Sequence, residues 1–177
     1  MIMQTELYFL RSSEQRIASD MLHFAYRLDE IGKTLDDFPE LDIYTKHYGL
    51  STRDLGIYIL KDHKIAGAAW IRLLRFDDTV PVLTMAIKPE FRGEGIGKMM
   101  LEQLLLEAAS RFEQISLSVL KDSRAVKFYE RFGFLKLEGS EAKSLIDGSD
   151  TITMIKRLEY KEVVRPSDGY DPSKWMD

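Results

Sequence analysis

The sequence predicts one domain of mixed α/β class, built on a sheet of about seven strands. Three observations predict this fold. The chain has 177 residues, a usual length for a single domain. Short apolar stretches typical of strands alternate with stretches at helical spacing. In the second half, a strand, an amphipathic helix and another strand follow one another, the order of a right-handed βαβ crossover. We expect residues 1–160 to form the domain and residues 161–177, which mix proline, glycine and charge, to form a tail or docking arm.

The chain begins with a strand and two helices. Residues 5–11 are apolar and aromatic, which favours a strand. Residues 12–32 predict an amphipathic helix, capped by Ser12 or Ser13. Apolar side chains recur there at helical spacing, at Ile17, Met21, Phe24, Ala25 and Leu28. A loop then leads into a shorter helix that ends near Gly49.

The middle of the chain predicts a meander of three strands. Residues 54–76 favour two strands joined by a turn at Asp62 and His63. Residues 77–89 supply a further turn and the third strand.

The second half supplies the crossover and closes the sheet. Residues 95–112 predict a helix whose apolar stripe shades into a polar face, as in a helix that lies on a sheet. The remaining elements are a strand, a short helix broken by a glycine, and two closing strands, at 114–120, 123–134, 134–139 and 150–159.

Composition excludes several classes of function. The chain has no cysteine, which removes thiolate catalysis, disulfides and cysteine-ligated zinc. A net charge of −4 gives no general attraction to nucleic acid or to an anionic membrane, so any anion site must be local. No apolar run reaches the length of a membrane span, the first residues lack the pattern of a signal peptide, and the histidines lack metal-ligand spacing. We therefore expect a cytoplasmic protein with no metal, whose partners include neither nucleic acid nor membrane.

The stretch KPEFRGEGIGKMM, from Lys88 to Met100, places three glycines where a helix is expected to begin. Glycine inside a helix costs about 1 kcal/mol relative to alanine, so another interaction must offset that cost. A helix N-terminus presents unpaired amides and the positive end of the helix dipole, which suit a phosphate, and glycines let the phosphate come close. The alternative is that the glycines only build a sharp strand-to-helix turn. The mononucleotide and dinucleotide glycine motifs do not fit the spacing of Gly93, Gly95 and Gly97.

What does fit is Arg92-x-x-Gly95-x-Gly97, directly after a strand and at the head of an amphipathic helix. This pattern resembles the coenzyme A signature of the GNAT superfamily of acyl-CoA-dependent N-acetyltransferases: Gln or Arg, two residues, Gly, one residue, then Gly or Ala. The segment SRAVKFYERFGF, at 123–134, resembles the second conserved helix of that family, at the family's usual separation. The resemblance covers residues 5–159. It implies the GNAT-like acyl-CoA N-acyltransferase fold, with a mostly antiparallel, twisted sheet and helices on both faces, and acetyl-CoA as acyl-donor cosubstrate.

The resemblance also implies roles for particular residues. Backbone amides would hold the pyrophosphate at Arg92, Gly93, Gly95, Ile96, Gly97 and Lys98. Further cofactor contacts are implied for the main chain of Met85 and Ile87, paired like an added strand with the pantetheine arm, and for the side chains of Ala125 and Phe128. Asp122 and Ser123 stand where the family often has Asn. An ionised Asp122 can accept a hydrogen bond there but cannot donate one.

Tyr129 is the residue expected to carry chemistry. The leaving thiolate of a thioester needs a proton or a hydrogen bond, and a phenol with a pKa of about 10 can supply one to a thiol with a pKa of about 8.5. The alternative is a core tyrosine that packs beside the neighbouring phenylalanines. Backbone amides near Ile87 would polarise the thioester carbonyl.

The acceptor side is less defined. An attacking amine must lose its proton, so a general base is expected, but the strand before the glycines carries no carboxylate. Candidates by position, each of which could also be an ordinary surface carboxylate, are Asp29, Glu30, Glu40 and Asp42. Aromatic residues that could line an acceptor pocket or pack in the core are Tyr26, Phe38, Tyr44, Tyr48 and Trp70. Trp70 and Arg72 share one strand face, so the two side chains could contact an acceptor together.

These residues predict an enzyme that transfers an acetyl group from acetyl-CoA to a primary amine of a small molecule or peptide, by direct attack in a ternary complex. The alternative is a non-catalytic acyl-CoA-binding sensor or interaction module with the same fold. The identity of the acceptor stays open, although the net acidity favours a basic one. The tail, with Tyr170 and Trp175, could fold over the sheet or over the second subunit of a homodimer.

Overall fold

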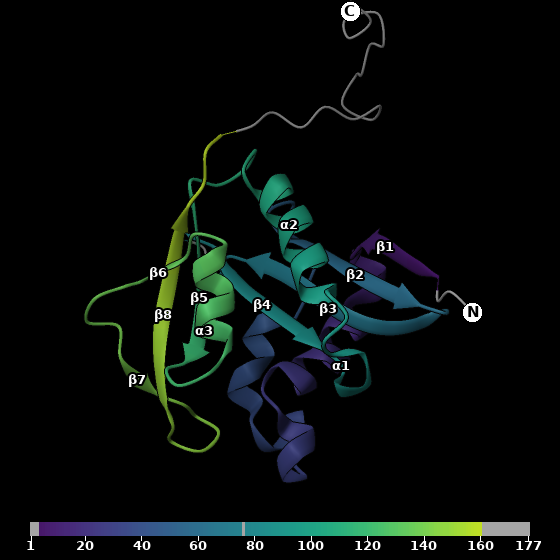
Figure 1. Cartoon of the computed structure of the whole chain (residues 1–177), viewed down its shortest axis with the longest axis horizontal. Coiled ribbons are helices and arrows are strands. Elements are labelled where there is room, and N and C mark those ends of the chain that lie inside the picture. Colours follow the sequence, from purple (N-terminus) through teal and green to yellow (C-terminus); the bar gives the residue numbers. More distant parts are fainter. Residues whose placement is uncertain (1–3, 76, 161–177) are drawn as a thin grey trace, which may run out of the picture.

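The computed structural model describes residues 4–75 and 77–160, whose arrangement is shown in Figure 1. The helices and strands are β1 (Thr5–Phe9), α1 (Gln15–Ala25), β2 (Leu55–Lys61), β3 (Lys64–Arg72), β4 (Val82–Ile87), α2 (Ile96–Ala108), β5 (Gln114–Leu120), α3 (Ala125–Arg131), β6 (Leu135–Lys136), β7 (Ala142–Lys143) and β8 (Asp150–Arg157). Short 3-10 helices are η1 (Ser12–Glu14), η2 (Leu28–Ile31), η3 (Leu35–Asp37), η4 (Pro39–Tyr44) and η5 (Pro89–Phe91). The expected tail, with Tyr170 and Trp175, lies outside the described residues.

A single sheet of eight strands organises the described residues. Its strand order is β1-β2-β3-β4-β5-β8-β6, and β7 also pairs with β8. Each pair of neighbours is antiparallel except β4 and β5, which are parallel and are connected through α2. The predicted fold class, a mixed and mostly antiparallel sheet containing one crossover, is confirmed.

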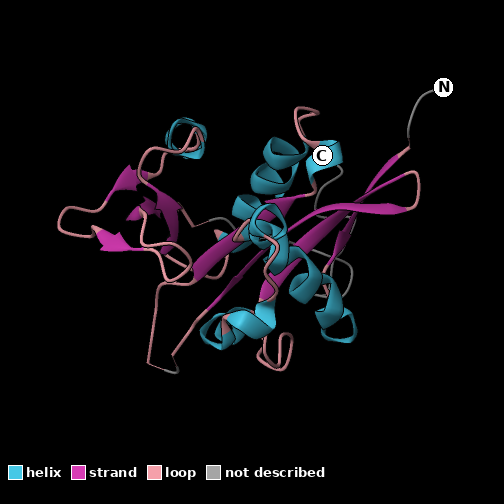
Figure 2. Cartoon of the chain, turned by 90° about the horizontal axis from the view of Figure 1, so that it is seen from below, coloured by secondary structure: helices cyan, strands magenta, loops and turns pink. Residues whose placement is uncertain are grey.

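Helices cover both faces of this sheet, as Figures 1 and 2 show together. One apolar core lies between the sheet and the helices α2 and α3, and it contains Leu104 and Phe134, both with no exposed surface. The second core lies beneath α1 and the 3-10 helices, and it contains Met21 and Trp70. The expectation of helices on both faces is confirmed. Within the residues described, no helix combines the length and apolarity needed to cross a membrane.

The hairpin of β2 and β3 has the predicted turn. Asp62 and His63 both adopt the left-handed backbone conformation, with φ of 48° and 66°. Two consecutive left-handed residues form the two-residue turn whose twist matches that of the flanking strands. The hairpin fixes the register of β3, so that Trp70 and Arg72 near its end lie beside the end of η4 and the residues that follow it.

The strands β4 and β5 meet at one end only. Their register contains a single Cα pair, Val82 with Ser116. Ser116 also donates its amide to the Pro81 carbonyl at 3.0 Å. Beyond this point the two strands run apart, as Figure 1 shows. The facing edges of both strands are therefore left without a strand partner in the interior of the sheet.

Some predicted elements differ from the structure. The helix predicted over residues 12–32 is divided, because Arg27 has a φ of 56° and separates α1 from η2. The second helix predicted to end near Gly49 is wrong. That region holds the 3-10 helices η3 and η4, and Pro39 at the start of η4 cannot donate a main-chain hydrogen bond to extend a helix through it. The strand predicted at 134–139 is reduced to β6, and β7 was not predicted.

Candidate active site

A cavity of about 410 Å³ opens where β4 and β5 separate. Its walls come from both strands, from the end of α1 and the segment after it, from α3 with the residues before it, and from the turn between β7 and β8. The lining includes Tyr26, Arg27, Glu30, Tyr44, Met85, Ser123, Ala125, Tyr129, Ser144, Ile146 and Asp147. The gap in the sheet thus brings together segments that lie far apart in the sequence.

The main chain of β4 faces this gap at alternate residues. Lys88 donates its amide to the Ala66 carbonyl at 2.9 Å, so the main-chain amide of Lys88 points toward β3. Because peptide groups alternate in direction along an antiparallel strand, those of Met85 and Ile87 point the other way, toward β5. The Ile87 carbonyl accepts a hydrogen bond from Arg92 Nε at 3.3 Å. Met85 and Ile87 therefore have the main-chain direction that pairing with an extended ligand requires.

The first turn of α2 presents amides that have no internal partner. The first bond of the helix runs from the Met99 amide to the Gly95 carbonyl at 3.1 Å. In the part of the chain that the structure describes, the amides of Gly95, Ile96, Gly97 and Lys98 donate no hydrogen bond. This is the arrangement that binds an anion at a helix N-terminus.

Two of the three glycines keep space open before these amides. Gly93 and Gly95 have φ values of 79° and 80°, a conformation that other residues adopt only with strain. A Cβ atom at either position would meet no atom within 4 Å. Neither glycine is therefore required by packing against the protein itself. The left-handed backbone conformation is one reason for glycine at these two positions, and the open space beside them can hold a ligand.

Gly97 is explained by packing instead. A Cβ atom there would lie 3.2 Å from Ile87 Cδ1, which is closer than an ordinary contact, and 3.5 Å from Phe128 Cζ, which is at the short end of ordinary contacts. Glycine at this position lets α2 approach both β4 and α3. The side chain of the preceding Ile96 is 1% exposed, so Ile96 offers only its amide to a ligand.

Charged side chains connect the glycine loop to its neighbours. Glu94 pairs with Lys61 at the end of β2, whose side chain is only 13% exposed. Arg92 Nη1 lies 3.8 Å from Glu30 Oε1, which joins the loop to η2. Lys98 is exposed and lies 3.9 Å from Glu102 one turn later in α2. Such an exposed pair is weak, so the Lys98 ammonium can turn toward an anion at little cost.

Tyr129 lies in α3 with its ring buried and its side chain in the cavity lining. The ring packs against Phe128 and Phe134, at centroid distances of 5.3 and 5.6 Å. Among the described residues, its hydroxyl has no hydrogen-bond partner. Burial raises the pKa of Tyr129 to about 12, so the phenol is neutral at physiological pH. A neutral phenol facing a cavity can donate one hydrogen bond to whatever the cavity holds.

Of the two residues expected to contact the cofactor just before α3, Asp122 and Ser123, the structure brings only Ser123 to the cavity. Ser123 lines the cavity, and its Oγ accepts the Ala125 amide at 3.0 Å. Asp122 is exposed and is not part of the cavity lining. The polar group that the structure brings to the cavity is thus Ser123. Ala125 lines the cavity, whereas Phe128 packs between Tyr129 and Phe132 and borders Gly97.

Of the four carboxylates considered as a base, the structure brings one into the cavity lining. Glu30 lines the cavity, whereas Asp29, Glu40 and Asp42 do not. Glu30 is also the carboxylate beside Arg92. Among residues 4–75 and 77–160, no group of three or more histidine or acidic side chains could hold a metal ion.

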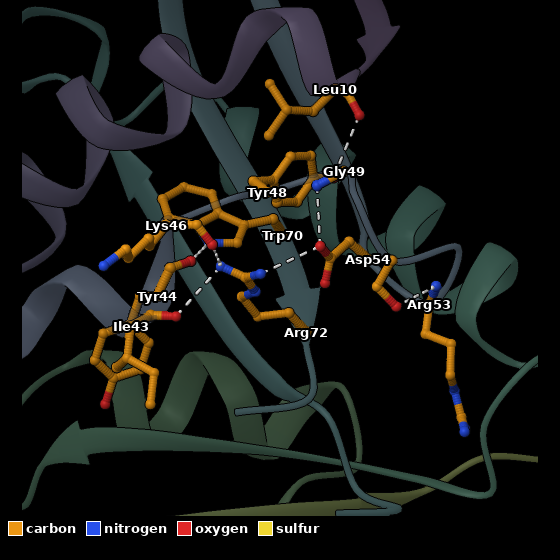
Figure 3. A network of polar contacts seen from close by, with 11 residues as sticks. Leu10, Ile43, Tyr44, Lys46, Tyr48, Gly49, Arg53, Asp54, Trp70 and Arg72 are labelled. Carbon is orange, nitrogen blue, oxygen red and sulfur yellow. Dashed lines mark hydrogen bonds and ion pairs between the residues drawn. The ribbon is translucent and has the colours of Figure 1, made fainter. Parts of the chain in front are cut away.

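The aromatic residues separate into two groups. Tyr26 and Tyr44 line the cavity, with ring centroids 5.8 Å apart, and burial together with Tyr44 raises the pKa of Tyr26. Trp70 and Tyr48 belong to the core beneath α1. The suggestion that Trp70 and Arg72 contact an acceptor is wrong, because both side chains bind main-chain carbonyls at the end of η4 and just after it, as Figure 3 shows.

Sequence reasoning missed the turn between β7 and β8. Ser144, Ile146 and Asp147 from this turn line the cavity. Hydrogen bonds from Ser149, with a smaller contribution from Arg27, lower the pKa of the Asp147 carboxyl. The signal for this turn was present in the sequence, because Asp147 is followed by Gly148 and Asp-Gly is a strong indicator of a hairpin turn.

Comparison with known proteins agrees with this geometry. Residues 53–136 match the family model described as the acetyltransferase (GNAT) domain. The predicted resemblance to the GNAT superfamily is confirmed. The GNAT match spans β2 to β6 and therefore includes the glycine loop, α2 and α3. None of the curated proteins matches the chain in sequence.

Solved structures share the GNAT fold over most of this chain. The ribosomal-protein-S18-alanine N-acetyltransferase from Escherichia coli has a TM-score of 0.66 at 18% identity, covering 90% of this chain and 97% of that chain. The yncA protein of Salmonella typhimurium, whose structure includes its cofactor acetyl-CoA, has a TM-score of 0.66 at 14% identity, covering 90% and 96%. A spermidine N-acetyltransferase, SpeG, from Vibrio cholerae has a TM-score of 0.59 at 18% identity, covering 87% and 94%. At these identities the likeness is one of fold.

Proposed function

We propose that this protein is an N-acetyltransferase that transfers an acetyl group from acetyl-CoA to a primary amine by direct attack in a ternary complex. The observation that carries the proposal is the gap between β4 and β5. Met85 of β4 and Tyr129 of α3 both line the cavity in this gap, and the first turn of α2, whose amides are unpaired, packs against Met85 and Ile87 at the end of β4. A sensor that only binds acyl-CoA would not require a buried phenol beside the cavity.

The residues present fit acetyl-CoA. Amides at the start of α2, with open space at Gly93 and Gly95, suit the pyrophosphate. The main chain of Met85 and Ile87 suits an extended arm lying along β4. For the arm to pair with the Ile87 carbonyl, Arg92 Nε must release it, and the guanidinium, which also lies 3.8 Å from Glu30, could then donate to a phosphate. Acetyl-CoA supplies a thioester, whose carbonyl carbon is open to attack by an amine.

Residues of this chain would then assist each change of charge. The Ile87 amide, which faces the gap, would donate to the carbonyl oxygen as negative charge develops there. Glu30, through water, would take a proton from the ammonium form of the acceptor, so that the free amine can form the new C–N bond. Tyr129 would donate a hydrogen bond to the sulfur as the C–S bond breaks. Each of these groups enters the proposal because of its place at the gap.

The replacement Glu30→Gln tests the base. We expect kcat to fall about tenfold at pH 7, because the amide cannot take a proton from the ammonium form of the acceptor. The loss should vanish above about pH 10, where an amine is largely unprotonated without help. The measurement is kcat against pH for the variant and the parent protein. Asp42→Asn, which changes a carboxylate outside the cavity, is the control and should leave the profile unchanged.

The proposed function is tested by binding and by thiol release. We expect titration calorimetry to show micromolar binding of acetyl-CoA and of CoA. Thiol release from acetyl-CoA is then measured with amines chosen from the activities of the structural relatives: spermidine, and a peptide that begins with alanine. Binding together with amine-dependent release supports the enzyme. Binding without release for any amine would support the acyl-CoA sensor instead, and no binding would overturn both.

A further inference from the structure

The segment of residues 43–49, which includes the end of η4, is held to the sheet by side chains of β3. Arg72 Nη1 donates to the Lys46 carbonyl at 2.8 Å and to the Ile43 carbonyl at 3.3 Å. Trp70 Nε1 donates to the Tyr44 carbonyl at 2.9 Å. Figure 3 shows these contacts converging from β3 on one short stretch of main chain. The stretch pairs with no strand of the sheet, so these side-chain contacts connect its main chain to β3.

Asp54 completes the network from the other end of the segment. Asp54 Oδ2 accepts hydrogen bonds from Arg72 Nη2 at 3.3 Å and from the Gly49 amide at 2.9 Å. The side chains of Arg72 and Asp54 are only 12% and 4% exposed. Arg72 and Asp54 thus form a largely buried ion pair that binds main-chain groups at both ends of the segment.

Stability alone is a poor explanation for this ion pair. Removing two charges from water costs free energy that their attraction often does not exceed, and apolar replacements are frequently as stable. Arg72 Nε has no hydrogen-bond partner in the described part of the chain, so part of that cost is not offset. What the pair does supply is direction, because a planar guanidinium fixes the positions of the groups that it binds.

Tyr44 lies between the two carbonyls that Arg72 binds, and its ring forms part of the cavity wall beside Tyr26. We propose that Arg72 and Asp54 are positioning residues for the acceptor side of the cavity. They hold Tyr44 against Tyr26, so that this wall keeps one shape when the acceptor enters. The link to acceptor binding rests on the proposed function, whereas the placement of Tyr44 does not.

The placement of Tyr44 is tested with the double variant Arg72→Met with Asp54→Leu, which removes both charges together and keeps apolar volume. 3-Fluorotyrosine is introduced at position 44 alone, and at position 129 alone as the control. We expect the ¹⁹F resonance at position 44 to shift and broaden in the double variant, while the resonance at position 129 stays in place and Tm changes by only a few degrees. An unmoved resonance at position 44 would overturn the proposal.

The role in acceptor binding is tested by kinetics with spermidine and with the alanine-initiated peptide. We expect KM for the amine to rise about tenfold in the double variant, because a wall displaced by about 1 Å misplaces the acceptor. The Kd of acetyl-CoA should not change. If the double variant does not fold, Arg72→Lys keeps the charge without the planar fork and should raise KM in the same direction.

Ile59→Val serves as the stability control, because Ile59 is fully buried in the opposite core and its truncation lowers stability without touching residues 43–49. A similar rise of KM in this variant would assign the effect to stability and overturn the positioning role. An unchanged KM in the double variant, despite a displaced Tyr44, would also overturn the positioning role. If the parent protein acetylates neither spermidine nor the alanine-initiated peptide, the proposed function fails for these two amines. The ¹⁹F measurement still decides the placement of Tyr44.

Discussion

Replacing Gly95 by aspartate is expected to weaken the binding of acetyl-CoA at least about 100-fold, on the order of 3 kcal/mol. Gly95 caps α2 with open space on its ligand side, so a side chain there would occupy the volume beside the unpaired amides. The carboxylate would also repel a pyrophosphate and would itself take up the amides and the positive end of the helix dipole. Titration calorimetry with acetyl-CoA, and separately with CoA, measures the loss.

Two matched variants separate charge from backbone strain. Gly139→Asp makes the same change at a glycine with a similar φ of 73° and equally open surroundings, outside the cavity lining. It should leave the Kd unchanged while costing comparable stability. Gly95→Ala adds strain without charge and should weaken binding only a few-fold. An undiminished affinity in Gly95→Asp would mean that the glycines serve only the turn between β4 and α2.

The parts of the fold predicted from sequence are those with a local cause. Asp62 and His63 predicted a turn because two polar residues divide two apolar strands, and both residues adopt the left-handed conformation. The glycine loop and α2 were predicted because glycine spacing and an apolar stripe are both read within a few residues. The course of the chain over residues 43–49 was not, since it depends on the contacts of Arg72, which are distant in sequence.

The same distinction applies to the site. The glycine loop and Tyr129 lie within segments whose sequence pattern is informative by itself. Asp147 and Ser144 enter the cavity only because β7 and β8 fold back against it, and no periodicity in the sequence reports that approach. The role of Arg72 was equally hidden. Strand alternation alone allows the Arg72 side chain to face a ligand. The three-dimensional arrangement shows instead that its guanidinium donates hydrogen bonds to main-chain carbonyls.

Replacing Tyr129 by phenylalanine is expected to lower kcat about 100-fold while leaving the Kd of acetyl-CoA unchanged. A single well-placed donor to a developing negative charge has an effect of roughly this size. Burial, which raises the pKa of Tyr129 to about 12, also narrows its role. A phenol with that pKa is a weaker acid than a thiol with a pKa of about 8.5, so complete proton transfer to the sulfur is uphill. Tyr129 should therefore act mainly by donating a hydrogen bond to the departing thiolate.

The pH dependence follows from the same shift. Since the phenol stays protonated in the folded protein until about pH 12, ionisation of Tyr129 should cause no loss of kcat between pH 7 and 10. Because the folded pKa lies above the unfolded value of 10.0, the stability that neutral Tyr129 contributes is complete below pH 10 and is lost as pH rises toward 12. Tyr129→Phe removes that titration. Between about pH 10 and 12, the free energy of unfolding should therefore fall less in the variant than in the parent protein, and the difference should be roughly 2 to 3 kcal/mol.

A second buried tyrosine provides the control for Tyr129. Tyr48 donates its hydroxyl to the Leu10 carbonyl at 3.3 Å and lies outside the cavity lining. Tyr48→Phe removes a structural hydrogen bond, so it should lower the free energy of unfolding by about 1 kcal/mol and leave kcat intact. Tyr129→Phe should show the reverse, because Tyr129 lines the cavity and its hydroxyl has no partner among the described residues. Unchanged kcat in Tyr129→Phe would reduce Tyr129 to packing against Phe128 and Phe134 and would leave the leaving thiolate to solvent.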